Sequence, residues 1–139
     1  MIENEIGDLG AAVERFIATS DSGNMAEIER IYAKDFLCLR APDTGQAMRL
    51  PRDTMLSILA SGTNPQRWSG TTSIDSVEII DGLGVVVLRR EKDVGHGPEV
   101  MFYCLIWRLD AAGWQFVREY VHQHALPGAV VRQDEGTTT

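Results

Sequence analysis

The sequence predicts an α+β fold in which three N-terminal helices pack on a strongly curved, mostly antiparallel sheet of about six strands that encloses a pocket. In the first half of the chain, apolar residues recur every three or four positions, which is the period of one face of a helix. Beyond Trp68, β-branched and aromatic residues dominate and short turn sequences interrupt them. Strands joined by short turns pair antiparallel, because parallel pairing needs a long crossover.

The helices are predicted from their apolar period and their end signals. Asn24, with Glu27 three positions later, resembles a capping box that begins a helix. Pro51 suits the first position of another helix, where its missing N–H has no intrahelical partner. Between these two helices, apolar runs around a turn sequence predict a small hairpin. The expected helices span residues 2–19, 24–33 and 51–62, and the hairpin strands span 36–39 and 47–50.

Four longer strands are predicted in the second half, separated by turn signals at 81–82, 95–98 and 110–113. We expect residues 1–125 to form one domain and residues 126–139, which have little to bury, to form a loose C-terminal tail. The expected strands span residues 68–80, 83–94, 99–109 and 114–124.

Composition excludes several classes of function for this 139-residue chain. Its formal charge of −7, without a basic stripe, argues against nucleic-acid binding. No apolar run is long enough to cross a bilayer, and the acidic start lacks the pattern of a secretory signal, so we expect a cytoplasmic protein without membrane contact. Cys38 and Cys104 lie in apolar strand patterns and predict buried thiols. His122 and His124 would share a strand face, but no third ligand is specified, and we expect neither a metal nor a cofactor.

Three segments resemble the nuclear transport factor 2-like superfamily, in particular its SnoaL-like and ketosteroid isomerase-like bacterial members. They are IYAKDFLCLRAPDTG, the helix that begins at Pro51, and VMFYCLIWRLDAAGWQFVREYVHQH, and the resemblance covers about residues 5–125. It implies a cystatin-like cone with an internal cavity, and often a homodimer. The superfamily includes isomerases, dehydratases, epoxide hydrolases and polyketide cyclases, as well as binding and assembly domains without activity.

One position departs from the ketosteroid isomerase-like pattern. In those members an aspartate that acts as the general base follows the segment that YAKDF resembles. In this chain Arg40 occupies the position of that aspartate. Asp43 lies nearby if the alignment shifts. A guanidinium stays protonated at ordinary pH and cannot abstract a proton. The resemblance therefore does not imply that isomerase mechanism for this chain.

The last hairpin allows a prediction of register. A four-residue loop at 110–113 pairs Leu109 with Trp114 and aligns a series of side chains on one sheet face. We assign this face to the concave side, because aromatic walls with a few polar groups are typical of a small-molecule pocket. The opposite face, from Phe102 to Arg108 on one strand and from Gln115 to Val121 on the other, is expected to form a homodimer contact. The predicted pairs on the concave face are Trp107 with Phe116, Leu105 with Arg118, Tyr103 with Tyr120, and Met101 with His122.

Arg118 is the leading candidate for a ligand contact, because a cation among aromatics must meet a carboxylate or an anionic or carbonyl-bearing ligand. A structural ion pair with Glu91, Asp75 or a helix carboxylate is the alternative. His122 is the catalytic candidate, since an imidazole exchanges protons near neutral pH. Structural roles remain alternatives for the tyrosines and Trp107. For Arg40 the alternative is a side chain directed from its strand toward water, and for His122 it is a neutral, hydrogen-bonded imidazole. The full set of predicted ligand-binding residues is Arg118, Tyr120, Tyr103, Tyr32, Arg40 and Trp107.

The sequence therefore predicts a small-molecule-binding cone domain. Its chemistry, if any, would be cofactor-independent isomerisation, dehydration or hydrolysis of a small apolar carbonyl or carboxylate compound. The alternative is a non-catalytic homodimeric interaction or assembly domain whose cavity is filled by its own side chains. A packed interior with Arg118 paired to an internal acid would favour that second reading.

Overall fold

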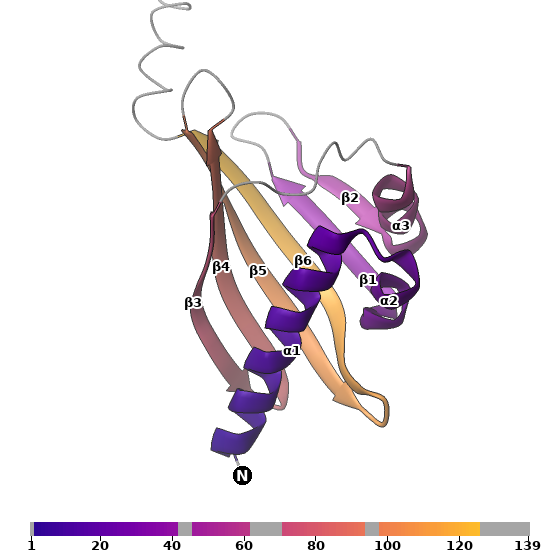
Figure 1. Ribbon diagram of the computed structural model, residues 1–139, viewed down its shortest axis with the longest axis vertical. Coiled ribbons are helices and arrows are strands. Elements are labelled where there is room, and N and C mark those ends of the chain that lie inside the picture. The colour runs from indigo at the N-terminus through magenta and orange to yellow at the C-terminus, as the bar shows by residue number, and fades with distance from the viewer. Residues whose placement is uncertain (1, 42–45, 62–70, 94–97, 126–139) are drawn as a thin grey trace, which may run out of the picture.

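The computed structural model describes residues 2–41, 46–61, 71–93 and 98–125, and these form three helices and six strands (Figure 1). The α+β class, the order of the elements and the mostly antiparallel sheet are as predicted. The tail predicted at 126–139 lies outside the described residues. The elements are α1 (Ile2–Ser22), α2 (Met25–Ile31), β1 (Tyr32–Ala41), β2 (Met48–Pro51), α3 (Arg52–Ala60), β3 (Thr71–Ile80), β4 (Leu83–Asp93), β5 (Pro98–Asp110) and β6 (Gly113–Ala125).

Local sequence signals explain the connection between the first two helices. Gly23 has a φ of +76° and its N–H donates to the Thr19 carbonyl at 3.2 Å, which ends α1 three residues later than predicted. The Asn24 side chain then accepts a hydrogen bond from the Glu27 N–H at 3.3 Å, as the capping-box pattern indicates. Tyr32 is already extended, so α2 ends at Ile31 and β1 begins earlier than predicted.

The strands form one sheet in the order β2-β1-β6-β5-β4-β3. The β1–β6 pair is parallel and the other four pairs are antiparallel. The sheet is open, with β2 and β3 at its edges among the described residues, and the predicted enclosure of a pocket stays a prediction.

The register predicted for the last hairpin is correct near the turn and wrong beyond it. Leu109 pairs with Trp114 and Trp107 pairs with Phe116, as expected, but a bulge at Val117 then shifts the register by one residue. Because side chains alternate between faces, one extra residue moves all that follow it to the other face. Arg118, Tyr120 and His122 therefore do not share a face with Trp107 and Tyr103. The observed pairs are Ile106 with Arg118, Leu105 with Glu119, Cys104 with Tyr120, Tyr103 with Val121 and Phe102 with His122.

The hydrophobic core lies between the helices and one face of the sheet, which we call the inner face, and α1 crosses this face (Figure 1). Phe16 of α1 contacts Trp107 edge-on at 5.5 Å and Phe116 at 4.9 Å between ring centroids. Leu9 packs over Gly84, where a Cβ would come within 2.5 Å of a Leu9 methyl group. The opposite face, on which Phe102, Cys104, Tyr120 and His122 lie, is called the outer face. These contacts hold the body of α1 against β4, β5 and β6.

None of the helices in the described ranges combines the length and the apolar character that a bilayer crossing requires.

Candidate functional site

Glu119 is the buried acidic residue of the inner face. The bulge at Val117 turns its side chain inward, between Cys38 of β1 and Leu105 of β5. Only 7% of the residue is exposed, and its Oε1 has no hydrogen-bond partner among the described residues. Burial raises the pKa of the Glu119 carboxyl to about 7, against opposing effects of Arg40, Cys38 and Arg90. Near neutral pH, this group is therefore able both to take up and to release a proton.

Arg40 lies one inward-facing position beyond Cys38 on β1, level with Val121 of β6. Its Nε is buried and has no hydrogen-bond partner in the part of the chain that the structure describes. The guanidinium lowers the pKa of both Glu119 and Tyr103, so its charge reaches the two groups. A buried N–H without an acceptor is costly, and an acceptor on a bound molecule would remove that cost.

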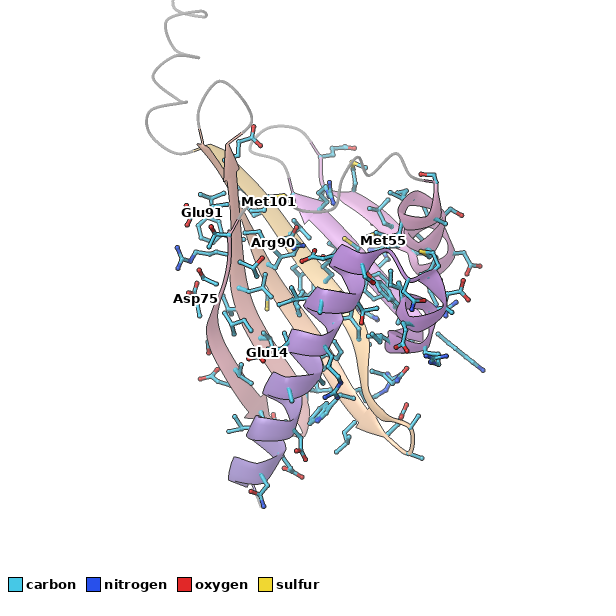
Figure 2. All side chains as sticks on the ribbon, in the orientation of Figure 1. Glu14, Met55, Asp75, Arg90, Glu91 and Met101 are labelled. Carbon is cyan, nitrogen blue, oxygen red and sulfur yellow. The ribbon has the colours of Figure 1, made fainter. Side chains whose placement is uncertain are left out.

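Arg90 of β4 is the second cation on this face, and two side chains hold it. Its Nε donates to Thr72 Oγ1 at 3.0 Å, and its Nη2 donates to Asp21 Oδ1 at 2.9 Å. Figure 2 shows Arg90 of β4 beside Met101 of β5, near the C-terminal end of α1. Asp75 of β3 and Glu91 of β4 lie on the opposite side of the sheet. The Asp21 contact therefore fixes a cation beside Glu119 and Tyr103 and ties α1 to the sheet.

Two tyrosines and a thiol complete the group. Burial raises the pKa of Tyr103 to about 12 and that of Cys38 to about 12, and it raises the pKa of Tyr32 well above its ordinary value. The Tyr103 hydroxyl donates weakly to the Met101 sulfur at 3.7 Å. All three groups are neutral at physiological pH, so the tyrosines are hydrogen-bond donors. We call this set the inner polar cluster: Tyr32, Cys38, Arg40, Arg90, Tyr103 and Glu119.

A separate cavity of about 450 Å³ opens on the outer face. The side chains of Phe102 and Tyr120 at this cavity are 39% and 42% exposed. The Nδ1 of His122 lies 3.1 Å from the Ala41 carbonyl oxygen. The lining is almost entirely apolar, which suits a hydrophobic group. The residues that border this outer cavity are Leu39, Ala41, Ala47, Val87, Phe102, Tyr103, Cys104, Tyr120, Val121 and His122.

The predicted site residues divide between the two faces. Tyr32, Arg40 and Tyr103 belong to the inner polar cluster, while Trp107 stacks on Phe116 at 5.0 Å in the core beneath it. Tyr120 and His122 border the outer cavity. The functional roles predicted for these residues stay predictions.

Arg118 lies on the outer side of the bulge, where its Nη1 donates to the carbonyls of Asp35 at 2.7 Å and Val117 at 2.9 Å. Among the described residues Arg118 makes none of the ion pairs considered for it, and Asp75 and Glu91 contact Arg89. Sequence reasoning missed Glu119 and Arg90. The unbroken alternation of the strand assigned Glu119 to the opposite face. Its inward position could have been predicted only if the bulge at Val117 had been known.

Solved structures with a similar fold are found in several bacteria. A protein of unknown function from Silicibacter pomeroyi, described as NTF-2 like, has 16% identity and a TM-score of 0.70, with 88% of this chain and 98% of that chain covered. A ketosteroid isomerase-like protein from Erwinia carotovora has 16% identity and a TM-score of 0.64, with coverage of 86% and 95%. An NTF2-like protein with a cystatin-like fold from Novosphingobium aromaticivorans has 14% identity and a TM-score of 0.64, with coverage of 94% and 87%.

At this level of identity the similarity shows the fold alone. The resemblance to the nuclear transport factor 2-like superfamily is thus confirmed as a fold. Comparison with models of protein families and with curated proteins gives no match. Any function must therefore be argued from the side chains of this chain.

Proposed function

We propose that this protein binds a small organic molecule at the inner polar cluster and transfers a proton on it, with Glu119 as the acid–base group. Two buried polar atoms carry the proposal, Glu119 Oε1 and Arg40 Nε, neither of which has a hydrogen-bond partner among the described residues. The two groups are near enough for the Arg40 charge to lower the pKa of Glu119. Burying such groups without hydrogen bonds is unfavourable, and a bound molecule that pairs with them would remove that cost.

The chemistry that fits these groups is cofactor-independent proton transfer next to a carbonyl. Glu119 has a pKa of about 7, which is the range in which an acid–base group works best at neutral pH. It would take a proton from the carbon beside the carbonyl and return it to the same or a neighbouring carbon. The negative charge that develops on the carbonyl oxygen would be stabilised by a hydrogen bond from Tyr103 and by the charge of Arg40. Isomerisation uses both transfers, whereas in a dehydration Glu119 would pass the proton to the departing hydroxyl group, which leaves as water. Glu119 replaces His122 in the role of base.

Deuterium exchange tests this function directly. The full chain is incubated in deuterium oxide with a panel of small cyclic ketones and enones, and loss of the proton signal next to the carbonyl is followed by NMR. We expect exchange with at least one compound, and Glu119→Gln should slow it by about 10²-fold or more. Glu14→Gln, on the exposed side of α1, is the matched control and should exchange as wild type does. Exchange that is absent throughout the panel, or unchanged in Glu119→Gln, would contradict the proposal.

We also propose that the outer face forms a homodimer contact, as the sequence suggested, but with a different set of residues. The bulge adds Arg118, Tyr120 and His122 to this face and removes Glu119 and Val121. Exposed aromatic side chains beside an apolar cavity support an interface of this kind, since such patches are uncommon on monomers.

Native mass measurement tests the dimer. The wild-type chain should have the mass of two subunits, and Phe102→Glu should give the mass of one. Ile58→Glu changes an equally exposed apolar residue on α3 and should leave the dimer intact. A monomeric wild-type protein would exclude this contact without affecting the inner site.

A further inference from the structure

We propose that the inner polar cluster also binds a monocarboxylate, and that Glu119 takes up one proton as it binds. The inference rests on the proposed site and names a second class of ligand for it. Because a protonated Glu119 cannot act as the base, the carboxylate complex is an unreactive state of that site.

The charges around the cluster explain why an anion fits. Two cations, Arg40 and Arg90, lie near two carboxyl groups, Glu119 and Asp21. The Asp21 carboxylate already accepts a hydrogen bond from Arg90 at 2.9 Å. The charge of Arg40 is therefore balanced by Glu119 only while Glu119 is ionised. When Glu119 is protonated, the cluster has one excess positive charge.

The unpartnered Nε of Arg40 identifies the group that the ligand would present. A guanidinium bonds a carboxylate through two parallel N–H···O contacts, which are stronger than bonds to a neutral carbonyl. The Glu119 carboxyl does not provide this contact, because neither its Oε1 nor Arg40 Nε has a partner among the described residues. A ligand carboxylate would satisfy Arg40 Nε, and a protonated Glu119 could donate to that same carboxylate through its own free oxygen.

Glu119 must be neutral in this complex, because two carboxylates beside each other cannot both stay ionised in a buried site. For a glutamate with the ordinary pKa of 4.5, protonation at pH 7 would weaken binding about 300-fold. With a pKa of about 7 the same step weakens binding only about twofold. The burial of Glu119 thus makes the site ready for an anion at neutral pH.

The groups that face Glu119 leave it as the proton acceptor of the cluster near neutral pH. From β1 these groups are Tyr32, Cys38 and Arg40, and from β5 the group is Tyr103. Burial raises the pKa of the Cys38 thiol and that of the Tyr103 hydroxyl to about 12, so neither titrates near neutral pH. From β4 it is Arg90, which Asp21 of α1 holds. Arg52 of α3 donates to the backbone carbonyls of Glu29 and Tyr32.

Calorimetric titration of the full chain tests the inference. The probes are acetate, hexanoate, benzoate and phenylacetate, each compared with its neutral amide. We expect at least one carboxylate to bind more tightly than its amide. Its apparent Kd should rise about eightfold from pH 7.5 to pH 8.5, because each complex takes up one proton. Heats measured at pH 8 in two buffers of different ionisation enthalpy should report the uptake of about one proton per complex.

Two variants separate the roles of the charges. Glu119→Gln keeps a neutral group at this position, so the carboxylate should still bind and its affinity should become independent of pH between 6 and 8.5. Arg40→Gln should abolish carboxylate binding, and a thermal unfolding curve checks that this variant is folded. Glu14→Gln is again the control.

The outcomes distinguish this inference from the function on which it rests. Ketone exchange that depends on Glu119, without binding of any carboxylate, overturns the inference and leaves the proposed function in place. Carboxylate binding without proton uptake, or with the same pH dependence in Glu119→Gln, also overturns it. Failure of both the ketones and the carboxylates would remove the site itself.

Discussion

The free energy of unfolding of the wild-type protein should fall as the pH rises, and replacing Glu119 with glutamine should abolish that fall. In the unfolded chain the carboxyl titrates near its ordinary pKa of 4.5, whereas in the folded chain burial raises that pKa to about 7. Between these two values the folded state holds the proton more tightly than the unfolded state. The free energy of unfolding therefore falls as the pH rises through this window. Below pH 4.5 the contribution is fully present, and above pH 7 it is lost.

The size of the effect follows from the difference between the two pKa values of Glu119. About 2.5 units at 1.36 kcal/mol per unit correspond to about 3 kcal/mol. Urea unfolding of wild type and Glu119→Gln at pH 4 and pH 8 measures it, because other titrating groups cancel in the difference between the two proteins. Relative to wild type, the variant should gain about 3 kcal/mol of stability between these pH values.

A matched variant isolates the effect of burial. Glu14→Gln removes an equal charge at an exposed position and should follow the wild-type dependence on pH. The reasoning would be refuted by a Glu119→Gln protein whose stability runs parallel to that of wild type from pH 4 to pH 8. That result would mean that Glu119 stays ionised in the folded protein, as an ordinary ion-paired carboxylate does.

Two further substitutions test the packing and capping that support the site. Gly84→Ala places a Cβ 2.5 Å from a Leu9 methyl carbon and 3.3 Å from the Trp107 Cβ. Measured by urea unfolding, it should lower the free energy of unfolding by about 1–3 kcal/mol. In a chain that already carries Leu9→Ala, the same glycine substitution should be nearly neutral. Asn24→Ala removes the acceptor for the Glu27 N–H and should cost about 1 kcal/mol by the same measurement, whereas Asn24→Asp should retain most of it.

The helices and most strands could be predicted because their signals are local. The apolar period predicted the body of α1, and Asn24 with Glu27 predicted the start of α2. The ends were less well predicted. Tyr32 and Ala33 continue the helical pattern in sequence, but both are buried in β1, where Tyr32 packs against Phe36 and Phe116. Tertiary contacts of this kind override a weak local preference.

The candidate site could be predicted only in part, because its composition depends on one residue of register. The turn at 110–113 fixes the pairs nearest to it, as far as Trp107 with Phe116. The next residue, Val117, is apolar and β-branched, and no glycine or proline marks it as a bulge. Tyr32, Arg40 and Tyr103 were placed in the candidate set without reference to this bulge, and they lie on the inner face.

The bulge also explains how one strand carries two different surfaces. Before it, Phe116 points into the core; after it, Glu119 and Val121 take the inner positions, and Arg118 and Tyr120 alternate outward. Without the extra residue, the guanidinium of Arg118 would lie inside beside Arg40 and Arg90, and the carboxyl of Glu119 would be in water. Three cations on one buried face would repel each other with a single acid, Asp21, to balance them. The bulge replaces one of those cations with a carboxyl whose proton can be exchanged near neutral pH, and the proposed chemistry depends on that replacement.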